Sequence, residues 1–155
     1  PAGARRRADR AAAALVERVG SCEGEPTLGD LLTAARALTG CETRLVPADF
    51  GSTRLFGMVV RLPVADVVMF DRYAPPTHQL FTILHEVGHL LLEHALMDGT
   101  AEPAESGCGG SIADERAAEY FAARVSHLLR VRSARMANPD SSAARIADTL
   151  TGGTP

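Results

Sequence analysis

The sequence predicts a single α+β domain in which a small, three-stranded, mostly antiparallel sheet packs on two helices. The chain has 155 residues, which falls within the size range of one domain. Its apolar share of 46% and charged share of 23% are those of an ordinary globular protein. Three short β-type runs stand in the middle of the chain, with helical patterns before and after them. We therefore assign residues 1–155 to one domain.

Two helices are expected before any strand. Residues 5–19 carry alanine, leucine and valine at helical spacing, and Gly20 is a plausible stop, which places an N-terminal helix within residues 1–20. After a turn-like segment, Thr27 can cap a second helix that ends at Gly40.

The β-type runs are residues 43–47, 54–61 and 65–70, and they are separated by proline and glycine. This pattern is typical of a short antiparallel meander. Three strands of this length form a small sheet that needs helices over one face.

A third helix is expected to follow the turn at residues 73–77 and to continue to about Ala95. Pro76 fits just before or at its first turn, with Thr77 as the other candidate cap. The segment 97–110 is rich in glycine, glutamate and alanine, and it reads as a loop.

A fourth helix is expected to open at Ser111 and Asp114, which fit a capping box, and to continue to Leu129. Residues 138–155 contain only a weak helical pattern and end in Gly-Gly-Thr-Pro. We expect this tail to be weakly ordered.

Charge and cysteine content exclude several classes of function. The net charge of −3 gives no general footprint for nucleic acid, and no apolar run reaches the length of a membrane span. Cys22, Cys41 and Cys108 are odd in number and widely spaced, which argues against a disulfide framework and favours a reducing compartment. The expected location is the cytoplasm.

The third helix carries the motif His85-Glu86-x-x-His89. Residues four apart lie on one helical face, with Cβ atoms about 5–6 Å apart, so both imidazoles can bind one ion. Glu86 falls on the flank of this pair, where a carboxylate can take a proton from a water molecule beside the metal. An amphipathic helix that merely carries two histidines is the alternative, but a buried helix leaves those side chains in need of partners. Zinc is the expected metal.

A catalytic zinc takes three protein ligands and one water, so a third ligand is required. Glu93 lies about 12 Å along the helix from His85 and cannot complete the site. His94 falls on the opposite face if the helix continues. Glu115 and Glu119 stand one turn apart on the fourth helix. We assign Glu115 as the ligand and Glu119 as the carboxylate that fixes a histidine ring, with the reverse assignment left open.

The run VVMFDRYAPPTHQLFTILHEVGHLLLEH resembles the strand, proline turn and "RFTLAHELGHLLL" pattern of the ImmA/IrrE family of small zincin-like metallopeptidases. The later run DERAAEYFAARV resembles that family's "E-x-E-A-N-x-F-A-A" helix, and the alignment places Glu115 on its first glutamate and Glu119 on its asparagine. The two runs cover residues 67–94 and 114–125. The resemblance implies a zincin-like fold, bound Zn²⁺ and a protease that cleaves or otherwise inactivates a transcriptional repressor, such as a helix-turn-helix protein.

The sequence offers candidates for stabilising the transition state and for binding the substrate. Tyr73, His78, Arg124 and His127 could each stabilise the transition state, and His78 ranks first because it lies seven residues before His85 on nearly the same helical face. An exposed edge among residues 54–70 could hold an extended peptide by strand addition.

Two other functions compete with proteolysis. The first is a binding protein of the same fold that sequesters a repressor or partner without cutting it. The second is a structural zinc site, in which Cys108 would replace the water as a fourth ligand.

Overall fold

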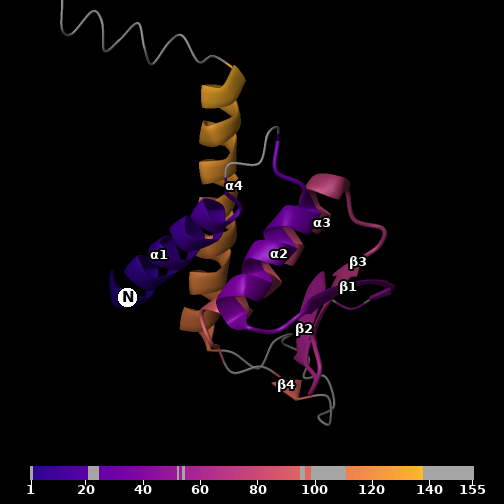
Figure 1. Ribbon diagram of the computed structural model, residues 1–155. Coiled ribbons are helices and arrows are strands. Elements are labelled where there is room, and N and C mark those ends of the chain that lie inside the picture. The colour runs from indigo at the N-terminus through magenta and orange to yellow at the C-terminus, as the bar shows by residue number, and fades with distance from the viewer. Residues whose placement is uncertain are drawn as a thin grey trace, which may run out of the picture.

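The structure is a computed structural model that describes residues 2–20, 25–51, 53, 55–94, 97–98 and 111–137. Its elements in chain order are α1 (Ala2–Arg18), α2 (Leu28–Thr39), β1 (Thr43–Ala48), β2 (Gly57–Arg61), β3 (Asp66–Asp71), α3 (Pro76–Leu91), β4 (Met97–Asp98) and α4 (Ile112–Ala137). In Figure 1, α1 crosses α4 on one side of the molecule and the strands lie on the other side. Helix α3 packs against α4 and also against β2 and β3. The predicted α+β class is confirmed.

The sheet is mixed, so the predicted antiparallel meander is wrong. The strand order is β1-β3-β2-β4. β2 and β3 form an antiparallel hairpin closed by a hydrogen bond from the Leu62 amide to the Ala65 carbonyl (3.0 Å), whereas β1 runs parallel to β3. β3 carries the continuous apolar run from Val67 to Phe70. Such a run is typical of a strand inside a sheet, and β3 has a strand partner on each of its edges. Residues 97–98, expected in a loop, form β4, which pairs in parallel with β2.

The first two helices follow their local signals. Thr27 caps α2 in a capping box: its hydroxyl accepts from the Asp30 amide (3.2 Å), and its own amide donates to Asp30 Oδ2 (2.8 Å). The helix closes at Gly40, whose amide donates to the Arg36 carbonyl. α1 ends at Arg18, close to the predicted stop.

α3 starts as predicted but ends early. Pro76 occupies its first turn, and Thr77 lies inside the helix and is not the cap. The helix ends at Leu91 rather than near Ala95, and Glu93 adopts a left-handed backbone conformation with φ of 55°. The chain therefore turns sharply just beyond the motif.

α4 begins with the predicted capping box, in which the Asp114 amide donates to Ser111 Oγ (3.2 Å) and the Ser111 amide donates to Asp114 Oδ2 (3.1 Å). The helix continues past the expected end at Leu129 to Ala137. The predicted tail at 138–155 lies outside the described residues. Among the helices that are described, none has the length and apolar character needed to cross a membrane.

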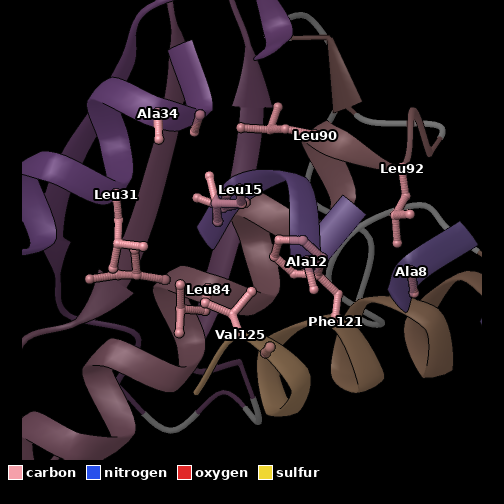
Figure 2. Close-up of a cluster of buried hydrophobic side chains, with 14 of the residues drawn as sticks. Ala8, Ala12, Leu15, Leu31, Ala34, Leu84, Leu90, Leu92, Phe121 and Val125 are labelled. Carbon is pink, nitrogen blue, oxygen red and sulfur yellow. The ribbon is translucent and has the colours of Figure 1, made fainter. Parts of the chain in front are cut away.

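The apolar core lies between α1, α2, α3, α4 and the sheet. Ala8, Ala12 and Leu15 form one fully buried face of α1 at helical spacing. They belong to the same buried cluster as Phe121 and Val125 of α4, as Figure 2 shows. This packing fixes α4 in the position from which it contacts α3.

Gly88 of α3 allows the two ligand-bearing helices to approach closely. An ideal Cβ at this position would lie 2.9 Å from Phe121 Cδ1 and 3.3 Å from Ala118 Cα. Both distances are too short for an ordinary contact, so a larger residue would push α4 away from α3. The glycine in the motif thereby helps to bring Glu115 toward the two histidines.

Candidate metal centre

α3 and α4 bring together His85, His89 and Glu115, the three predicted ligands. His85 Nε2 lies 3.1 Å from His89 Nε2 and 3.2 Å from Glu115 Oε2, and His89 Nε2 lies 3.6 Å from Glu115 Oε1. Three ligand atoms held tetrahedrally at about 2.0–2.1 Å from one ion stand about 3.3 Å apart. The observed spacing therefore fits coordination of a single ion.

The described residues do not satisfy all the polar atoms of this cluster. Glu115 Oε1 is buried and finds no hydrogen-bond partner among them, and His89 is fully buried. Two facing imidazole nitrogens can share only one proton between them. A cation satisfies both ring lone pairs and the carboxylate at once, and two imidazoles with one carboxylate form a ligand set suited to divalent transition metals.

Burial also sets the protonation state of His89. Burial lowers the pKa of His89 to about 4, and the neighbouring His85 and His94 shift it in the same direction. Metal binding requires a neutral imidazole. His89 is therefore in the binding form at neutral pH before any ion arrives.

The side chain of Glu86 extends from α3 toward the first residue of β2. It is buried, and Oε1 would be 3.0 Å from an ideal Cβ at Gly57, the first residue of β2. That Cβ would also overlap Thr82 Cγ2 and lie 3.2 Å from the Met69 carbonyl oxygen. β2 can approach α3 this closely only because residue 57 has no side chain. Sequence reasoning missed Gly57, although a glycine at the start of a strand often marks such a close approach.

The structure reduces the predicted peptide-binding edge, residues 54–70, to a short part of β2. β4 pairs only with Val60 and Arg61, so within the described residues the outer edge of 57–59 has no strand partner. Phe56, immediately before this edge, is 53% exposed and lies against His78 with ring centroids 4.9 Å apart. His78 therefore lies near this free edge, and its role in stabilising the transition state stays a prediction.

Other candidates occupy different places. Glu119 is exposed, and within the described residues no hydrogen bond joins it to either histidine, so its role in fixing a histidine ring stays a prediction. Arg124 Nε donates to Asp9 Oδ1 at 2.7 Å, which ties it to α1. Tyr73 is exposed. Cys108, the proposed fourth ligand of a structural site, lies outside the described residues.

His94 was expected on the opposite helical face, but the structure places it against His89. Because α3 ends at Leu91 and the chain turns at Glu93, the His94 amide donates to the His89 carbonyl (3.1 Å). The two rings meet with Nδ1 atoms 3.1 Å apart. On its other side, His94 Nε2 lies 3.5 Å from Asp114 Oδ1. Sequence reasoning missed this contact because it extended the helix by several residues.

Comparison with known proteins agrees with this geometry. A peptidase M78 family model, described as the IrrE N-terminal-like domain, matches residues 41–126, which is more than half of the chain. The matched region contains all three candidate ligands and Glu86. No curated protein matches the chain. No solved structure matches it either.

Proposed function

Because the chain belongs to the IrrE N-terminal-like family of peptidases, we propose that it is a zinc-dependent metalloprotease that cleaves a regulatory protein, such as a helix-turn-helix transcriptional repressor. The observation that carries this proposal is the meeting of His85, His89 and Glu115 at the spacing of a single ion. Family membership supports peptidase chemistry and a metal. The choice of zinc rests on the two-histidine, one-carboxylate ligand set.

The residues divide the chemistry between them. His85, His89 and Glu115 would hold the ion, and zinc bound there supplies Lewis acidity and lowers the pKa of a coordinated water. Glu86, adjacent to the first ligand, accepts a proton from the attacking water at its carboxylate and returns it to the leaving amine. Glu115 contributes the one negative charge of the ligand set, so the set does not neutralise a divalent ion.

The edge of β2 supplies a place for the substrate. An extended peptide can add to a free strand edge through backbone hydrogen bonds, and residues 57–59 present such an edge beside α3. Gly57 lies next to both this edge and Glu86, so a peptide paired there passes close to the base. The exposed ring of Phe56 offers an apolar contact for a substrate side chain.

The proposal is tested by metal analysis of the purified chain followed by incubation with a helix-turn-helix repressor encoded by an adjacent gene. We expect about one zinc per chain and cut repressor fragments. Glu86→Gln should keep the zinc and lose cleavage, His85→Ala should lose both, and the exposed control Glu17→Gln should lose neither.

Two outcomes of this experiment contradict the proposal. If Glu86→Gln cleaves the repressor at the wild-type rate, Glu86 is not the base. If the wild-type chain binds the repressor and never cuts it, and Glu86→Gln binds it equally well, the protein is a non-cleaving binding protein.

A further inference from the structure

The His94 ring lies in a buried contact that the proposed chemistry does not use. Its side chain is only 2% exposed and lies between His89 and Asp114. His89 faces the ligand cluster with Nε2 and faces His94 with Nδ1. The contact therefore involves the nitrogen of His89 that is left over when Nε2 binds a metal.

The positions of the ring protons decide which histidine donates and which accepts in this contact. Two Nδ1 atoms 3.1 Å apart form a hydrogen bond only if one carries the proton and the other accepts it. A neutral His89 that uses Nε2 as a ligand carries its proton on Nδ1. His94 Nδ1 must then be the acceptor, and the His94 proton lies on Nε2, the nitrogen nearest Asp114 Oδ1.

We propose that His94 is a positioning residue that, together with Asp114, fixes the tautomer and ring orientation of His89 for metal binding. This inference rests on the proposed metal site and adds residues to it. Ligand histidines commonly donate their second N–H to a carboxylate or carbonyl. Here a second imidazole stands between the ligand and the carboxylate, in the role predicted for Glu119.

The surrounding contacts hold this chain of groups in place. Asp114 Oδ2 accepts from the amide and hydroxyl of Ser111 at 3.1 and 2.9 Å, which leaves Oδ1 for His94. Asp114 directly precedes Glu115, so the start of α4 carries both a ligand and the support of another ligand. Arg7 Nη2 of α1 donates to the Leu92 carbonyl at 2.8 Å and secures the turn that carries His94.

The first test measures Zn²⁺ affinity of the full chain by competition with a chelating dye. Substituting such a supporting residue typically weakens metal affinity by about 10–100-fold, and we expect this loss for His94→Leu. His94→Asn should restore most of the affinity because its amide oxygen can accept at the position of Nδ1. Thr27→Ala is the control, because it removes the same kind of capping contact from α2, a helix that carries no residue of the site, so it should bind zinc as the wild type does.

The second test reads the ring protons directly by nitrogen NMR of labelled histidines in the metal-free and zinc-loaded chain. We expect His89 to be protonated on Nδ1 and His94 on Nε2 in both states. Wild-type zinc affinity in a folded His94→Leu variant, or the reversed tautomer pair, would overturn the inference. A wild-type chain that shows the expected tautomers but takes up no zinc would instead overturn the proposed metal site.

Discussion

Replacing Gly57 with alanine should damage catalysis more than metal binding. The added Cβ would overlap Thr82 Cγ2 and lie 3.0 Å from Glu86 Oε1, and the nearby Met69 carbonyl belongs to the backbone of β3 and cannot move aside easily. β2 must therefore move away from α3, or Glu86 must move. The three atoms nearest the added Cβ belong to Thr82, Glu86 and Met69, and none belongs to a proposed metal ligand, so the ligands should keep their positions.

The expected magnitudes follow from the clash. Overpacking a tight contact costs about 1–3 kcal/mol, which corresponds to a melting temperature lower by roughly 3–10 °C for a chain of this size. A displacement of about 1 Å at a catalytic group can lower turnover about 100-fold. The assays are thermal unfolding, repressor cleavage and zinc affinity, and the last should remain at the wild-type value.

A compensating substitution tests whether the clash with Thr82 causes the effects of Gly57→Ala. Thr82→Ser removes only the overlapping methyl group, so the double variant should be more stable than the sum of the two single effects by at least about 0.5 kcal/mol. Gly29→Ala is the matched control, because its Cβ would meet only Thr27 Oγ1 at an ordinary 3.6 Å. If Gly57→Ala cleaves and melts like the wild type, the close approach of β2 does not position Glu86.

Two further predictions concern packing and pH. Gly88→Ala should lower the free energy of unfolding by about 1–3 kcal/mol, because its Cβ would lie 2.9 Å from Phe121 Cδ1; unchanged thermal unfolding would contradict the tight α3–α4 contact. The pKa of His89 is about 4 in the folded protein, whereas its ordinary value is 6.5. Below pH 6.5 the His89 ring therefore binds more protons in the unfolded chain than in the folded one. The metal-free protein should then lose up to about 3 kcal/mol of stability as the pH falls from 6.5 to 4. Urea unfolding across this range measures the loss, and a flat profile would show that His89 is not buried as a neutral ring.

The features that could be predicted from the sequence are those set by neighbours within a few residues. Thr27 and Ser111 were recognised as caps because each bonds to a residue three positions away. His85 and His89 were paired because helical geometry alone places them on one face. Such contacts need no knowledge of the rest of the fold.

The features that could not be predicted depend on where distant segments meet. The position of β3 between β1 and β2 is decided by pairing across the sheet, which short apolar runs do not encode. The contact of His94 with His89 required knowledge that α3 ends at Leu91. No strong stop such as proline follows that residue, and the left-handed conformation of Glu93 is uncommon for a residue with a side chain.

The region that matches the family begins at residue 41, yet the site depends on residues before it. Ala12 and Leu15 of α1 are fully buried in the cluster that holds Phe121 of α4, and Phe121 in turn lies beside Gly88 at the centre of the motif (Figure 2). Arg7 secures the turn that carries His94. α4 therefore packs against α3 at one contact and against α1 at another. Both contacts determine the distance between the histidines of α3 and the glutamate of α4.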